Sequence, residues 1–103
     1  MGENNKPLHV TGTEKIARLY EIRELFKGDS AVNQRARLLQ AITEYPVSTL
    51  EARQYLDILH PAGRIQELRD SAWKIDTVRV AEQTECGKPH NVARYVLLVE
   101  VPS

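Results

Sequence analysis

Residues 48–69, STLEARQYLDILHPAGRIQELR, carry the clearest structural signal in this chain. Ser48 and Glu51 have the spacing of a capping box, in which the side chain of each residue accepts a hydrogen bond from the backbone of the other. This pattern predicts a short helix that begins after Ser48 and runs to about Leu56.

A second helix is expected directly after it. Residues 57–60 form a turn, and Pro61 suits the first helical position, where its missing N–H group costs nothing. We expect this helix to end near Ser71. At 100° per residue, one stripe of the helix faces inward. The predicted inward residues are Ile65, Leu68 and Ala72.

Two helices are predicted upstream of this pair. Ser30 is a typical N-cap for a helix that runs to about Glu44, because apolar residues follow it at helical spacing. Thr13 is the predicted N-cap of an earlier helix, which runs to about Lys27 and is closed by Gly28. The apolar face of that earlier helix is too broad for an isolated surface helix, so it packs on the domain or on a partner chain.

Downstream, the spacing of apolar residues changes from helical to alternating. Residues 73–80 and 94–101 are rich in β-branched and aromatic residues and are predicted to be two strands. The polar residues 82–91 between them are the predicted tip of a hairpin, and we expect residues 81–92 to act as a wing.

Three helices followed by a two-stranded hairpin is the order of a winged helix-turn-helix domain. The fold class we expect is mainly α with a small antiparallel β-hairpin, α+β, with an extra N-terminal helix. Residues 1–12 are predicted to be a disordered lead, residues 13–28 an accessory helix and residues 30–101 the winged domain.

Composition limits the classes of function. The 103 residues allow one domain, and 42% hydrophobic with 27% charged residues is typical of soluble globular proteins. The single cysteine, Cys86, excludes an internal disulfide framework and fits a reducing, cytoplasmic location. The chain has no apolar run near the roughly 20 residues of a membrane span. Since 14 basic side chains balance 14 acidic ones, any DNA binding depends on where they lie locally.

Motifs for catalysis are missing from the sequence. We find neither a Gly-rich phosphate loop nor a nucleophile elbow nor a zinc-protease motif. Cys86 and His90 have the spacing of half a zinc site, but His9 and His60 are distant in sequence. We therefore expect no enzymatic activity, no cofactor, no metal and no small-molecule substrate.

The helix after Pro61 is the predicted DNA-contacting element, because the major groove admits a helix with its side chains. Its outward face carries Gly63, Gln66, Glu67 and Asp70. The residues expected at base edges are Arg64, Gln66 and Glu67. The residues expected on phosphates are Arg53, Arg69, Lys88, His90 and Arg94.

A neutral monomer would bind DNA weakly, so we expect a homodimer. Its expected contacts are Ile16, Leu19, Ile22 and Phe26.

Two alternatives stay open at this point. The charged residues of this helix can form a solvated face with local ion pairs, such as Arg64 with Glu67. The whole domain can also be a protein-interaction module, because Glu67 and Asp70 make the outward face acidic.

Several segments together resemble a small winged helix-turn-helix family that is found widely in phage and prophage genes. They are residues 33–39 (NQRARLL), 48–53 (STLEAR), 60–69 (HPAGRIQELR) and 75–77 (IDT). The resemblance implies a small DNA-binding regulator of phage or prophage origin, with double-stranded DNA as its partner.

The chain departs from that family after Arg69. Relatives tend to have basic residues followed by a glycine there, whereas this chain has Asp70, Ser71 and Ala72. We expect a weaker grip on phosphate at the end of the helix, and an exit into the strand without the usual left-handed cap. The N-terminal helix is expected to be an addition to the family pattern.

Overall fold

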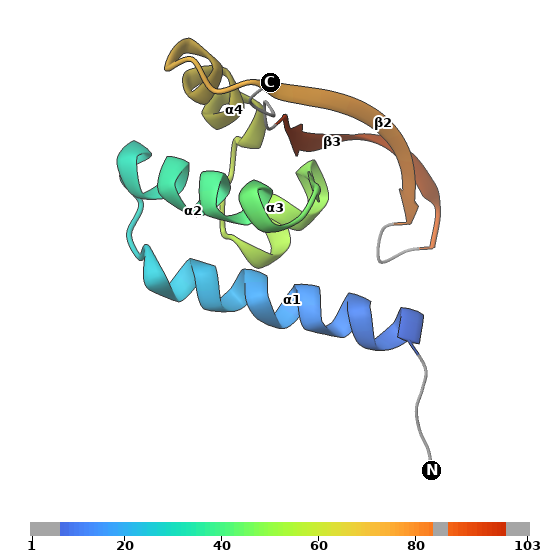
Figure 1. Ribbon diagram of the computed structural model, residues 1–103. Helices are drawn as coiled ribbons and strands as arrows, with labels where there is room; N and C mark the ends of the chain where they lie inside the picture. Colours follow the sequence, from blue (N-terminus) through green and yellow to red (C-terminus); the bar gives the residue numbers. More distant parts are fainter. Residues whose placement is uncertain (1–6, 84–86, 99–103) are drawn as a thin grey trace, which may run out of the picture.

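The computed structural model describes residues 7–83 and 87–98, with side chains from residue 12 onward (Figure 1). In chain order the elements are α1 (Pro7–Leu25), α2 (Ala31–Glu44), β1 (Val47–Ser48), α3 (Thr49–Tyr55), α4 (Pro61–Asp70), β2 (Ile75–Gln83) and β3 (Pro89–Leu97). The strands form one antiparallel sheet in the order β1-β3-β2. The expected α+β winged arrangement is therefore confirmed.

The predicted starts of three helices are confirmed, two of them by side-chain caps. The Ser30 side chain accepts a hydrogen bond from the Asn33 backbone N–H at 3.1 Å, which starts α2. Ser48 and Glu51 form the full capping box of α3, with distances of 3.1 and 3.0 Å. Pro61 occupies the first turn of α4. Each of these signals needs residues at most three positions apart.

Helix α1 begins earlier and ends earlier than the sequence suggested. It runs from Pro7 to Leu25, not from Thr13 to Lys27. Pro7 is well suited to a first helical turn because its fixed φ is already helical. Gly28 has a positive φ of +113°, but it does not directly follow the helix as predicted, because α1 already ends at Leu25. The rest of the predicted lead, residues 1–6, lies outside the described residues.

The end of α4 contradicts two expectations about Ala72. Ala72 is exposed and does not belong to the buried stripe, because it lies beyond the last helical residue. Its φ of +77° is left-handed. Its N–H donates to the Arg69 carbonyl at 2.9 Å, and that of Trp73 donates to the Leu68 carbonyl at 3.1 Å. These two bonds define a Schellman motif, so a left-handed cap forms here without glycine.

The hairpin is longer at its tip than predicted. Residues 82 and 83, expected in the loop, pair with residues 90 and 89 and extend both strands. β3 ends at Leu97, and residues 84–86 and 99–101 of the predicted loop and strand lie outside the described residues. Because most side chains of this segment are exposed, no apolar alternation marks the backbone pairing. The two-residue strand β1 was not predicted, and Val47 pairs there with Tyr95.

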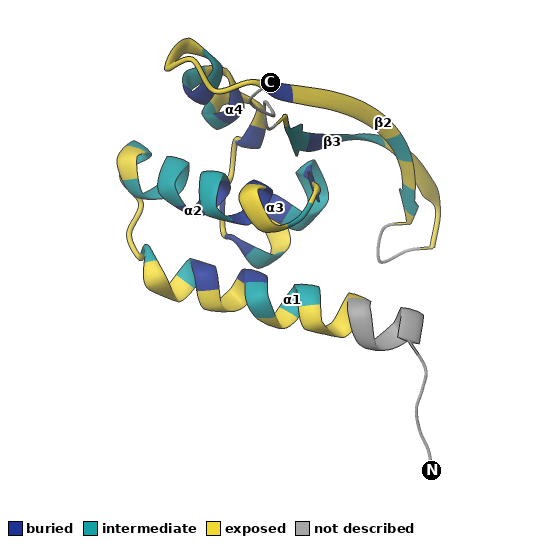
Figure 2. Ribbon diagram, viewed as in Figure 1, coloured by how far each residue is buried: buried dark blue, intermediate teal, exposed yellow. Residues whose placement is uncertain are grey.

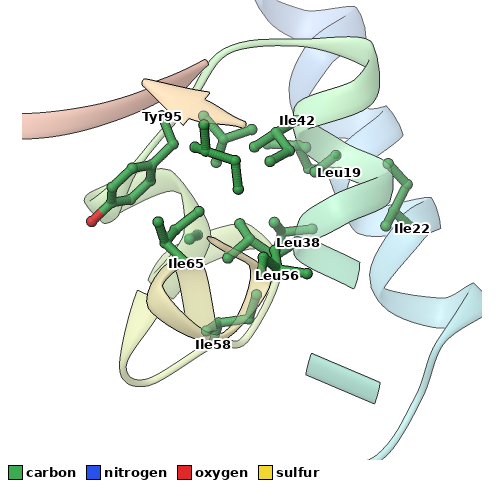
Figure 3. Close-up of a cluster of buried hydrophobic side chains, with 13 residues drawn as sticks. Leu19, Ile22, Leu38, Ile42, Leu56, Ile58, Ile65 and Tyr95 are labelled. Carbon is green, nitrogen blue, oxygen red and sulfur yellow. The ribbon is translucent and has the colours of Figure 1, made fainter. Parts of the chain in front are cut away.

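The core lies between α1, α2, α3, α4 and the inner face of the sheet (Figure 3). Leu19 and Ile22 of α1 are completely buried against the chain's own domain. Figure 2 shows buried residues on the side of α1 that faces α2. Leu19 and Ile22 therefore cannot make the dimer contacts expected of them unless they leave the core. Ile16 and Phe26 are half-buried.

Candidate nucleic-acid interface

Helix α4 has one buried and one exposed face. Pro61, Ile65 and Leu68 are buried, which fixes the orientation of the helix on the domain. Residues 62, 63, 66 and 70 are exposed on the other side. The Gln66 amide nitrogen donates to the Asp70 carboxylate at 3.0 Å. The outward face predicted from helical spacing is therefore present, and it is polar.

Glu67 lies at the flank of this face and holds two arginines. Arg64 Nη2 donates to Glu67 Oε2 at 3.0 Å, which is the local pair that the sequence suggested. Arg35 Nη1 of α2 donates to Glu67 Oε1 at 2.9 Å. The carboxylate thus bridges α2 and α4, and the partly exposed Arg64 and Glu67 side chains are paired with each other.

Arg69 is hydrogen-bonded to residues at the start of β2. Its Nε and Nη2 donate to the Ile75 carbonyl at 3.0 and 2.8 Å, and Nη2 also donates to Thr77 Oγ1 at 2.8 Å. The guanidinium therefore fastens the end of α4 to the start of β2. Arg53 is exposed on α3, and its Nε donates to the Leu59 carbonyl at 3.3 Å, in the turn before α4.

The cationic residues of the hairpin lie apart from α4. Lys88 and His90 are exposed, and Arg94 Nη2 lies 3.8 Å from Glu82 Oε2. Figure 1 shows that the hairpin starts beside the end of α4 and curves away from it toward the N-terminal part of α1. The structure therefore gathers Arg64, Gln66 and Glu67 on α4 and places Lys88 and His90 at the far end of the hairpin.

A buried arginine, Arg37, supports the turn that positions α4. Its Nη1 donates to the carbonyls of Phe26 and Gly28 at 2.7 and 2.8 Å, and Nη2 donates to that of Asp57 at 3.2 Å. Burial lowers the pKa of the Arg37 guanidinium, and the nearby charges of Asp57 and Asp29 partly oppose this shift. Arg37 thereby joins the α1–α2 connection to the turn between α3 and α4.

Sequence reasoning missed both Arg35 and Arg37. Arg37 precedes Leu38 within the inward side of α2, and an arginine at such a position is a signal that it is hydrogen-bonded internally. Arg35 has no comparable local signal, because its partner Glu67 is 32 residues away.

Within residues 12–83 and 87–98, no three His, Cys, Asp or Glu side chains are grouped so that they could hold a metal ion. Cys86, half of the weak zinc pattern, lies outside the described residues. None of the described helices is long and apolar enough to span a membrane.

Comparison with known proteins yields one match. A family model described as a winged helix-turn-helix domain matches residues 33–100, which is about two thirds of the chain. The match begins in α2, covers α3, α4 and the hairpin, and leaves out α1. Neither the curated proteins nor the solved structures include a significant match.

Proposed function

The chain belongs to the winged helix-turn-helix domain family, and from this membership we propose that it binds double-stranded DNA sequence-specifically as a transcriptional regulator. The phage or prophage origin that the sequence resemblance implies is part of the same proposal. The observation that carries the proposal is the exposed polar face of α4. Its opposite face is buried, and Arg69 ties its end to β2. A rigid helix presented in this way is what the major groove accepts.

Gln66 is the best-placed residue for base contact. It is exposed, and its amide can both donate to and accept from the edge of an adenine. Gly63 is also exposed, and an added Cβ would meet no atom within 4 Å, so the backbone can approach a base pair there. Arg64 and Glu67 would reach bases only by exchanging their mutual ion pair for contacts with DNA.

Contacts to phosphate are proposed for Arg53, Lys88, His90 and Arg94. Arg53, Lys88 and His90 are exposed, and Arg94 is partly exposed. Arg69 is less suited, because its guanidinium is engaged with Ile75 and Thr77. In a homodimer, Ile16 on α1 and Phe26 directly after α1 are the residues of the expected set that keep some exposed surface.

The test is fluorescence anisotropy with the DNA that flanks the gene and with a scrambled duplex, over a series of salt concentrations. We expect tighter binding to the flanking duplex, and Gln66→Ala should cost roughly 1–3 kcal/mol on that duplex with little change on the scrambled one. Equal, weak binding of both duplexes would contradict sequence specificity.

A protein-docking role is the second candidate. The observation that favours it is the exposed Asp70 beside Glu67 on the outward face of α4, in a chain with zero net charge. Asp70→Lys separates the two functions. It should tighten binding to any duplex if α4 faces DNA, because it removes a negative charge near phosphates. Unchanged DNA binding would favour the docking role.

A further inference from the structure

The charges on α4 cancel one another, which is unfavourable for a helix that contacts DNA. Its two arginines, Arg64 and Arg69, are matched by two acids, Glu67 and Asp70. Since DNA binding depends on neutralised phosphates, a helix whose charges cancel gains little from them. An additional positive charge must come from another element.

Arg35 supplies that charge from α2. Its guanidinium and that of Arg64 hold the two oxygens of one carboxylate, at 2.9 and 3.0 Å. Two positive charges around one negative charge leave this cluster with an excess of one. The cluster is open to solvent, because the side chains of Arg35, Arg64 and Glu67 are 32%, 21% and 39% exposed.

The cluster also has unused hydrogen-bonding capacity. Each guanidinium has five N–H donors in a planar fork, and the bonds to Glu67 use one nitrogen of each. A phosphate group accepts the same forked donors as a carboxylate, with more charge and more oxygens.

We infer that Arg35 and Arg64 form a site for a backbone phosphate of DNA, and that Glu67 occupies the two guanidinium groups until DNA binds. The inference rests on the proposed function and adds a residue of α2 to the interface. Phosphate contacts position a protein on DNA without specifying the base sequence. Arg35 therefore contributes equally on every duplex.

The experiment measures duplex affinity of the full chain over a salt series for the wild type, Arg35→Ala and Glu67→Gln. Arg35→Ala should reduce the slope of log K against log[salt] by about 1, on both the flanking and the scrambled duplex. Glu67→Gln should tighten binding to both, since it removes the competing carboxylate charge.

Arg18→Ala is the matched control. Arg18 of α1 also pairs with a glutamate of α2, Glu44, at 2.8 Å, so its loss changes net charge and an inter-helix ion pair in the same way. The slope should not change in this variant. If Arg35→Ala lowers the melting temperature, the comparison uses Arg35→Gln in place of Arg35→Ala, because glutamine keeps a donor for Glu67.

The outcomes separate the two proposals. An unchanged slope in a folded Arg35 variant that still binds DNA makes Arg35 a brace between helices and overturns this inference alone. An equal loss of slope in Arg18→Ala overturns it as well, because the effect is then one of net charge. No binding of the wild-type chain to either duplex overturns the proposed function, and this inference with it.

Discussion

The Ser48 hydroxyl donates to the Glu82 carboxylate at 2.8 Å and thereby joins the N-cap of α3 to β2 across 34 residues of sequence. The same hydroxyl oxygen accepts the Glu51 backbone N–H, and the Glu51 carboxylate is 3.0 Å from Lys15 Nζ of α1. One chain of polar contacts therefore connects the accessory helix, the α3 cap and the hairpin.

Removing the Glu82 carboxylate should loosen this connection. Ser48 is fully buried, so Glu82→Ala leaves its hydroxyl donor unsatisfied and should cost about 1–3 kcal/mol of unfolding free energy. Glu82→Gln keeps an acceptor oxygen and should cost less. Urea denaturation provides the measurement, with the exposed Glu14→Ala on α1 as the control. Equal stability of Glu82→Ala and the control would show that the contact is not stabilising.

Ala72→Gly should stabilise the protein. A left-handed backbone costs a residue with a Cβ roughly 1–2 kcal/mol, and glycine avoids this while losing about 0.5–1 kcal/mol through its freer unfolded state. The expected net gain is about 0.5–1 kcal/mol in the free energy of unfolding. Ala62→Gly makes the same chemical change inside α4 and should destabilise by a similar amount. Effects of the same sign at both positions would argue against the Schellman motif.

Leu19→Ala should destabilise the chain strongly. Leu19 is completely buried, and deleting such a side chain costs about 2–5 kcal/mol. Leu25 lies on the same helix but is 62% exposed, so Leu25→Ala should have little effect. Thermal unfolding at several protein concentrations distinguishes core packing from dimerisation. A melting temperature of the wild type that rises with concentration, and does so less in Leu19→Ala, would contradict packing within one chain.

The stability of the α1–α2 contact should depend on pH. The hydrogen bonds from Arg18, above all, hold the pKa of Glu44 below its usual value of 4.5. Because the folded pKa is lower than the unfolded one, this stabilisation is present above about pH 4.5 and is lost as the pH falls through the folded pKa. Melting temperatures between pH 7 and pH 3 should therefore fall more for the wild type than for Arg18→Ala. Parallel curves would mean that the ion pair contributes nothing.

The sequence predicted features made by neighbouring residues better than features made by residues far apart in the chain. The sequence marked the starts of α2 and α3 by their caps, which are made by residues at most three positions apart. It marked the start of α4 by Pro61, whose fixed φ suits a first helical turn. The paired ends of the hairpin were missed, since its side chains are mostly exposed and apolar alternation does not reveal the backbone bonds. The left-handed Ala72 was missed because residue type argues against it, while two backbone hydrogen bonds favour it.

The candidate site likewise has one part that the local sequence predicts and another that only tertiary packing determines. The residues of the chain establish the helix-turn-helix order and the outward face of α4, because helical geometry relates Gly63, Gln66 and Asp70 without reference to any other element. Tertiary packing determines that Glu67 pairs with Arg35 of α2 and that Leu19 is buried. These contacts join residues brought together when α1 and α4 dock on α2, and no local periodicity encodes which side chains then meet.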